Sequence, residues 1–247
     1  MLKFLIAPDF PAAIFAGWYF LNTHLQNHTS QRIQLYLPES SARQNELMQQ
    51  QRMDLVYANP FDASDLVRQQ HYLPLVRPLN RSDEIIIAAR LDAPYHHSDQ
   101  LQPGCRILVT ENRDLGMIGR RLLESAALSE QDINWLPVDS FEEATRRLMA
   151  GEAEAGFFLA AVYRHFCART QSQLKILMES RIYDLSHVIL LHPAAAEWLP
   201  ALRQAFSELA DSSEGRRILA DLDIRGFIEV TQDETEFMLD LIETLQD

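Results

Sequence analysis

The sequence predicts an α/β protein of two lobes, in which each lobe is a mainly parallel sheet flanked by helices. Short apolar segments alternate with segments of helical periodicity between residues 2 and 78, and the alternation starts again near residue 106. Two further apolar strands, at 85–89 and 187–191, stand where the chain would pass from one lobe to the other. Alternating strands and helices are typical of doubly wound parallel sheets.

The first lobe opens with a buried strand followed by an amphipathic helix. Residues 2–7 form a short apolar run that ends at Pro8, as a buried strand does. In the helix expected at 12–26, the apolar residues recur at helical spacing. The other elements expected here are strands at 33–37, 54–58 and 73–76 and helices at 41–51 and 62–69.

The second lobe and the C-terminal part repeat this pattern. A strand is expected at 106–109, then a polar turn at 110–116 and a helix at 117–127. Further strands are expected at 133–136, 155–159 and 174–178, with a helix at 140–150. The last part is mainly helical, with helices expected at 196–210, 213–221 and 233–245.

These elements predict the boundaries of the lobes. We expect lobe I to comprise 1–84 and 192–247, and lobe II to comprise 90–186. The strands at 85–89 and 187–191 would be hinge strands between them. Hinge closure around a ligand is a recurrent use of such an architecture.

Composition and charge exclude several classes of function. The chain has 247 residues, of which 47% are hydrophobic, so it can build one large or two small cores. A formal net charge of -13 disfavours contact with nucleic-acid phosphates and anionic membranes. No stretch reaches the roughly 18 apolar residues of a membrane span. We therefore expect neither a nucleic-acid partner nor membrane insertion.

Motifs of catalysis and metal binding are absent from the sequence. Cys105 and Cys167 are too few for a disulfide framework and match no metal motif. His96 and His97 are adjacent in a polar loop, and adjacent residues rarely converge on one metal. The chain contains no GxSxG, HExxH, Walker A or GxGxxG motif. The sequence therefore predicts a binding protein with no catalytic residues, no metal and no cofactor.

The apolar run at the N-terminus is not the pattern of a signal peptide, because Pro8, Asp9 and Pro11 interrupt it. We expect a periplasmic location if the chain is a mature or excised domain, and a cytoplasmic one if Met1 is native.

Several segments, in this order, resemble one known family. They read FLIAPDFPAAIFAGWYFL, MDLVYANPFDA, RSDEIIIAARLDA, LQPGCRILVTEN, SFEEATRRLMAGEAEAGFF and SEGRRILADLDIRGFIEV. Together they resemble the phosphate, phosphite and phosphonate substrate-binding proteins of ABC transporters, which have the type 2 periplasmic-binding fold. The resemblance covers residues 4 to about 237 and implies a two-lobed clamp for a small polar ligand, with an ABC permease or a signalling protein as partner.

One segment departs from the pattern of this family. The family has a turn rich in Ser and Thr after the first strand of the second lobe, where hydroxyl groups and a helix N-terminus hold the phosphonate oxygens. Here Arg113, Asp114 and Leu115 replace the small hydroxyl residues, while Gly116 is kept. A carboxylate in this turn repels a doubly charged phosphonate, and Arg113 compensates in part. A carboxylate, zwitterionic or cationic ligand, or the loss of ligand binding, is then open as well.

Candidate ligand residues follow from the rule that ligands bind at the carboxyl ends of strands in doubly wound sheets. In the first lobe these are Asp9, Phe10, Tyr57 and Asn59, although Asp9 could equally be a helix cap and Asn59-Pro60 a plain turn. In the second lobe the candidates are Thr110, Glu111, Asn112, Arg113 and Phe157. Tyr183 is a further candidate because it lies before the return strand at 187–191, where it could touch the rim of the cleft.

Alternatives remain open for the second set. The segment 110–114 could be a solvated polar turn, and of Phe157 and Phe158 one is expected in the core and the other at the cleft.

Three functions are consistent with these observations. The first is a solute-binding protein or sensor domain that clamps a small polar ligand, with a phosphonate-like or phosphate-like oxyanion as one candidate. The second is a cytoplasmic enzyme of the dehydratase or lyase kind on the same fold, with Asp9 or Glu111 as its acid or base. The third is a degenerate binding domain that contacts another protein.

Overall fold

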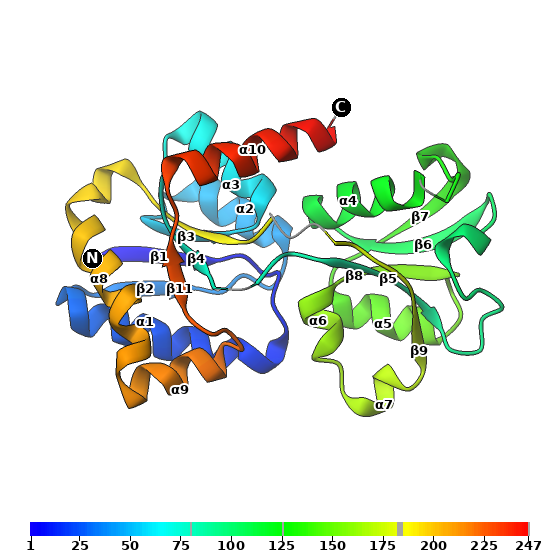
Figure 1. Ribbon diagram of the computed structural model, residues 1–247, viewed down its shortest axis with the longest axis horizontal. Helices are drawn as coiled ribbons and strands as arrows, with labels where there is room; N and C mark the ends of the chain where they lie inside the picture. Colours follow the sequence, from blue (N-terminus) through cyan, green and yellow to red (C-terminus); the bar gives the residue numbers. More distant parts are fainter. Residues whose placement is uncertain (80, 125, 182–184, 247) are drawn as a thin grey trace. The chain divides into compact units, whose positions relative to one another are not determined.

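The chain forms two compact units in the computed structural model, which describes residues 1–79, 81–124, 126–181 and 185–246. The first unit consists of Met1–Ser82 and Tyr183–Thr244, and the second of Asp83–Ile182 and Leu245–Asp247. Each unit has its own sheet with helices packed on it (Figure 1). This confirms the α/β class and the organisation in two parts.

The sheet of the first unit has six strands in the order β11-β4-β10-β3-β1-β2. They are β1 (Leu2–Ile6), β2 (Ile33–Tyr36), β3 (Leu55–Ala58), β4 (Leu73–Pro78), β10 (Val188–Leu191) and β11 (Phe227–Glu229). β1 is parallel to β2 and β3, whereas β10 lies between β3 and β4 and is antiparallel to both. Because Val188 pairs with Ala58, β10 begins at the edge of the sheet where β1 and β3 end.

Helices cover both faces of this sheet. The helices are α1 (Phe15–Thr29), α2 (Ser41–Gln50), α3 (Pro60–Gln70), α8 (Leu199–Ser207), α9 (Ser213–Asp221) and α10 (Gln232–Gln246). α1, α8 and α9 lie on one face, and α2, α3 and α10 lie on the other (Figure 1).

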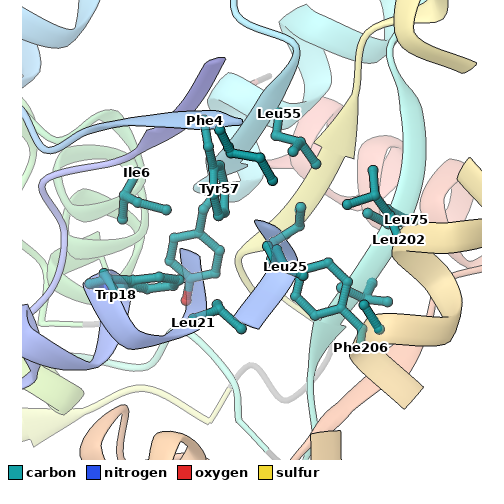
Figure 2. Close-up of a cluster of buried hydrophobic side chains, with 14 of the residues drawn as sticks. Phe4, Ile6, Trp18, Leu21, Leu25, Leu55, Tyr57, Leu75, Leu202 and Phe206 are labelled. Atoms are coloured by element: carbon teal, nitrogen blue, oxygen red, sulfur yellow. The ribbon is translucent and has the colours of Figure 1, made fainter. Parts of the chain in front are cut away.

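The core of the first unit lies under α1, α8 and α9. Figure 2 shows Phe4, Leu55 and Leu75 of the sheet facing Leu25 of α1 and Phe206 of α8. α1 and α9 approach each other closely at Gly17, because a Cβ atom there would lie 2.9 Å from the backbone of Asp221. Burial of such side chains, at roughly 25 cal/mol per Å² of apolar surface, is the main force that holds the unit together.

The sheet of the second unit has the order β7-β6-β8-β5-β9. Its strands are β5 (Ile85–Arg90), β6 (Cys105–Thr110), β7 (Ile133–Val138), β8 (Ala155–Leu159) and β9 (Leu174–Glu179). β6 is parallel to β7 and β8, and β5 is antiparallel to β8 and β9. α4 (Arg113–Glu124) packs on one face and α5 (Phe141–Met149) on the other (Figure 1). Both sheets are therefore mixed: β10 and β11 run antiparallel to their neighbours in the first, and β5 does so in the second.

The two strands expected to be hinges each belong to one sheet. β5 lies inside the sheet of the second unit and β10 inside that of the first. The chain changes unit at 82/83 and at 182/183, before each of these strands, and again at 244/245. The predicted lobe boundaries and the hinge role stay predictions.

Several short elements were not expected from the sequence. They are β11, α6 (Ala160–Arg164) and α7 (Ala168–Gln171). Each is too short to show a period, so only packing in the folded unit defines it. None of the helices in the described part of the chain has the length and apolar character needed to cross a membrane.

Candidate functional site

Polar side chains of the first unit meet where β1 and β3 end and β10 begins. Asn59 caps α3, since its side-chain oxygen accepts a hydrogen bond from the backbone N–H of Asp62 at 2.9 Å. The amide nitrogen of Asn59 donates to Asp9 at 3.0 Å and to Asp62 at 3.2 Å. One amide thus fixes the loop after β1 against the helix after β3.

Asp9 also faces a histidine that the sequence reasoning did not select. His187 Nε2 lies 3.6 Å from Asp9 Oδ2, and both side chains are only 4% exposed. A carboxylate in such a place needs partners to offset its loss of hydration. His187 was missed because only the antiparallel register of β10 places it beside Asn59.

Gln44 and Asp62 are further members of this cluster that sequence reasoning missed. The side-chain amide of Gln44 donates to Asp62 Oδ2 at 2.6 Å, and Gln44 is buried within α2. Gln44 stands in a polar segment that gave no signal of burial. This bond connects α2 to the first turn of α3.

A series of aromatic rings extends from this polar cluster. The Tyr57 ring stacks on His187 with centroids 4.8 Å apart, and Trp18 packs on Tyr57 at 4.7 Å. Phe10, which is half-buried, follows Trp18 at 6.0 Å. The indole N–H of Trp18 is buried and has no hydrogen-bond partner within the described part of the chain. Figure 2 shows the Trp18 and Tyr57 rings together at the margin of the core.

The structure thus brings all four candidates of the first unit together. Asp9, Tyr57 and Asn59 are buried and Phe10 is half-buried, so these residues form a packed cluster rather than an exposed loop. The cap on α3 is Asn59, which the sequence suggested as a ligand residue or as part of a plain turn. Asp9 instead takes part in the hydrogen-bonded cluster.

In the second unit, the helix α4 begins earlier than the sequence predicts. The expected start was residue 117, but α4 starts at Arg113. The reason is Asn112, whose side-chain oxygen accepts from the backbone N–H of Leu115 at 2.7 Å. Thr110 to Arg113 therefore form the end of β6 and the N-terminus of a 12-residue helix, rather than a solvated turn.

This helix N-terminus carries two buried donors. The Thr110 hydroxyl and the Asn112 side-chain amide group are buried and make no hydrogen bond to any described residue. Because Asn112 Oδ1 is held by Leu115, the amide nitrogen has a fixed direction. The first N–H groups of a helix lack partners inside it and attract anions. The local chemistry favours an oxyanion.

Charged residues flank these donors. Glu111 and Arg113 are exposed, and Asp114 is only 1% exposed. A buried carboxylate in the first turn makes the helix N-terminus less favourable for a second negative charge. This arrangement suits a singly charged oxyanion better than a doubly charged one.

The remaining candidates of the second unit are Phe157 and Tyr183. Phe157 is fully buried, packs on the Trp135 ring and lies against Gly119 of α4; Phe158 is fully buried as well. Both are therefore core residues, and Phe157 supports α4. Tyr183 lies outside the described residues.

No cluster of His, Cys, Asp or Glu suitable for a metal ion occurs among the residues that the structure describes.

Comparisons with known proteins identify the family and the fold. A family model for the periplasmic substrate-binding protein of phosphonate ABC transporters matches residues 4–235. No curated protein matches the sequence.

Solved structures of several binding proteins are similar to the chain. PhnD1 from Prochlorococcus marinus, solved with methylphosphonate, has a TM-score of 0.85 at 12% identity, covering 99% of this chain and 98% of its own. A binding component of a phosphonate transporter from Pseudomonas aeruginosa has a TM-score of 0.84 at 13% identity, covering 98% and 86%. The aliphatic sulphonate binding protein SsuA from Escherichia coli has a TM-score of 0.68 at 14% identity, covering 99% and 92%. At these identities the similarity shows the fold, not the ligand.

Proposed function

The chain belongs to the family of periplasmic substrate-binding proteins of phosphonate ABC transporters, and we propose that it binds a small phosphonate-type oxyanion at the N-terminus of α4. Membership confirms the resemblance found in the sequence. The family consists of binding proteins, so the chain is a binder rather than an enzyme. We further propose that its partner is an ABC permease, to which it delivers the ligand.

The observation that carries the proposal is the pair of buried donors at Thr110 and Asn112. A buried donor without a partner costs about 1–3 kcal/mol, and an anion placed there would offset this cost. The exposed guanidinium of Arg113, on the first residue of α4, adds a positive charge beside them. Asp9, Phe10, Tyr57 and Asn59 stay candidate ligand residues of the first unit.

Isothermal titration calorimetry with methylphosphonate tests this site. Each donor makes a hydrogen bond to a charged oxygen, which contributes about 1.5–3 kcal/mol, so Thr110→Val should weaken binding about tenfold or more. Asn112→Asp keeps the cap on α4 but replaces the free amide nitrogen by an anionic oxygen. We expect it to abolish measurable binding.

A matched control exists in the first unit. Ser212 caps α9 by accepting from Gly215 N at 2.8 Å, so Ser212→Asp adds the same charge at another helix N-terminus. Methylphosphonate affinity should stay unchanged in this variant. Equal affinity of wild type, Thr110→Val and Asn112→Asp would show that the ligand binds elsewhere.

A further inference from the structure

A cavity of about 350 Å³ lies within the first unit, between β4, β10 and α10. Ser186 and Val188 line it, while His187 and Ile189 alternate with them along the chain. Neighbours in a strand point to opposite faces, so the cavity lies on the face away from His187 and Tyr57. It is therefore separate from the cluster around Asp9. Its volume is at the lower end of the roughly 300–1,000 Å³ of small-molecule sites.

Two hydrogen-bond donors, Arg77 and Ser186, line this cavity. Arg77 is half-buried, and its charge contributes to lowering the pKa of Glu234 on the same cavity. Ser186 is only 5% exposed and also lines the cavity. A half-buried guanidinium and the hydroxyl of a buried serine on one wall can both donate hydrogen bonds to an anionic group of a ligand.

Carboxylates stand on the opposite wall, in the first turn of α10. Asp233 and Glu234 both line the cavity. The backbone N–H and the hydroxyl of Thr231 donate to Glu234 at 2.9 and 3.0 Å, and these bonds lower the pKa of Glu234. This side chain is therefore negatively charged at neutral pH. A doubly charged anion would be repelled, whereas an ammonium group would be attracted.

The remaining lining is apolar. Val188, Val230 and Met238 are buried, and Phe237 is 60% exposed at the margin. Apolar surface of this kind holds an aliphatic or aromatic group by the hydrophobic effect.

Ion pairs and buried side chains hold α10 beside the cavity. Arg68 of α3 forms ion pairs with Glu236 at 2.5 Å and Asp240 at 2.9 Å, both on α10. Leu239 and Ile242 of α10 are fully buried. These ion pairs and buried side chains attach α10 to the rest of the first unit.

We infer that this cavity binds a small zwitterion, namely an α-amino acid with an apolar side chain. The carboxylate of the ligand accepts from Arg77 and Ser186. Its ammonium group faces Asp233 and Glu234, and its side chain packs on Val188 and Met238. This site goes beyond the oxyanion site of the second unit and shares no residue with it.

Titration of the whole chain with L-leucine tests the inference. L-leucine should bind the wild type, and leucinamide and 4-methylpentanoate should bind at least tenfold more weakly, because each lacks one of the two charges. Arg77→Met should lower L-leucine affinity at least tenfold and leave methylphosphonate affinity unchanged. Ser186→Ala removes one atom with little risk to folding and should lower L-leucine affinity several-fold.

Arg203→Met is the matched control for Arg77→Met. Arg203 belongs to the same unit but is paired with Glu229 at 3.6 Å, so L-leucine affinity should not change in this variant. The inference is overturned if the wild type binds neither L-leucine, L-methionine nor L-phenylalanine, or if Arg77→Met and Ser186→Ala bind L-leucine as the wild type does. It is also overturned if L-leucine competes with methylphosphonate and is lost in Asn112→Asp.

Discussion

Asn59 has two structural roles, and different substitutions distinguish them. Its side-chain oxygen caps α3, and its amide nitrogen donates to both Asp9 and Asp62. Asn59→Asp keeps the cap but places a third carboxylate among two others. We expect it to lower the free energy of unfolding by about 1–3 kcal/mol at neutral pH, measured by urea denaturation. Asn59→Ser, which keeps the cap without a charge, should cost less.

Lowering the pH should reduce the loss in free energy of unfolding caused by Asn59→Asp, because protonation of the introduced carboxyl group restores a hydrogen-bond donor. An Asn59→Asp variant as stable as the wild type at pH 7 would contradict the role assigned to this amide.

Asp114 determines how much negative charge the site on α4 accepts. Its carboxylate is buried in the first turn of the helix. Asp114→Asn removes that charge, so methylphosphonate affinity should rise, most clearly above the second ionisation of the phosphonate. Calorimetric titration at two pH values measures this. An equal gain in methylphosphonate affinity at both pH values would mean that the effect of Asp114 does not come from its charge.

Sequence reasoning missed His187 and Gln44 for the same reason. His187 and Gln44 enter the cluster through sheet register and helix packing, which no single-sequence pattern encodes. By contrast, Tyr57 lies near the end of β3 and Asp9 and Asn59 follow strands, so the rule that ligands bind at strand ends found them. Asp114 was recognised as the departure from its family, but its burial became visible only in the structure.

Among the elements, α4 is held close to the sheet by Gly119. A Cβ atom at this position would lie 2.2 Å from the Phe157 ring. Gly119→Ala should therefore destabilise the second unit by about 1–3 kcal/mol through overpacking, as measured by thermal or urea unfolding. In Gly116→Ala the new Cβ would meet only the end of the Arg120 side chain, at 3.3 Å. Gly116→Ala should leave the free energy of unfolding unchanged or raise it slightly. Equal losses of stability in Gly116→Ala and Gly119→Ala would contradict the close packing of Gly119 on Phe157.

The contact between α1 and α8 makes stability depend on pH. Burial lowers the pKa of His24 from its usual 6.5, although the hydrogen bond between its Nε2 and Ala205 O, at 3.1 Å, opposes this. Below that pH the unfolded chain takes up a proton that the folded chain resists, so stability falls as pH falls through 6.5.

His24→Gln tests this dependence, because Gln keeps a donor for Ala205 and does not titrate. The loss in free energy of unfolding between pH 7.5 and 5.5 should become smaller in this variant. His96→Gln, in an exposed loop, is the control and should behave as the wild type. An unchanged pH dependence in His24→Gln would contradict the assignment.

Among the helices and strands, the sequence predicted long elements better than short ones. Strands such as β1 and β3 were placed correctly because apolar runs and prolines define their limits. The start of α4 was wrong by four residues, since polar residues at 113–116 lie in its first turn. Capping by Asn112 decides that start, and a cap is a local hydrogen bond that a hydropathy pattern does not show.

At the scale of the whole molecule, the predicted fold and family are confirmed, and the chemistry of the ligand is the proposal. The order of strands and the segments shared with the family were sufficient for the first two. They were insufficient for the ligand, because it depends on a few side chains such as Thr110 and Asn112. Binding proteins of this fold include examples named for phosphonates and for sulphonates.

Thermal denaturation of the whole chain with methylphosphonate, phosphite, phosphate and sulfate tests the central claim most directly. A ligand at 100 times its dissociation constant adds about 2.7 kcal/mol to the free energy of unfolding, which is a rise in Tm of several degrees at this size. We expect such a rise with methylphosphonate or phosphite and little change with sulfate. No rise with any of these phosphorus oxyanions would contradict the account and favour a domain that contacts another protein.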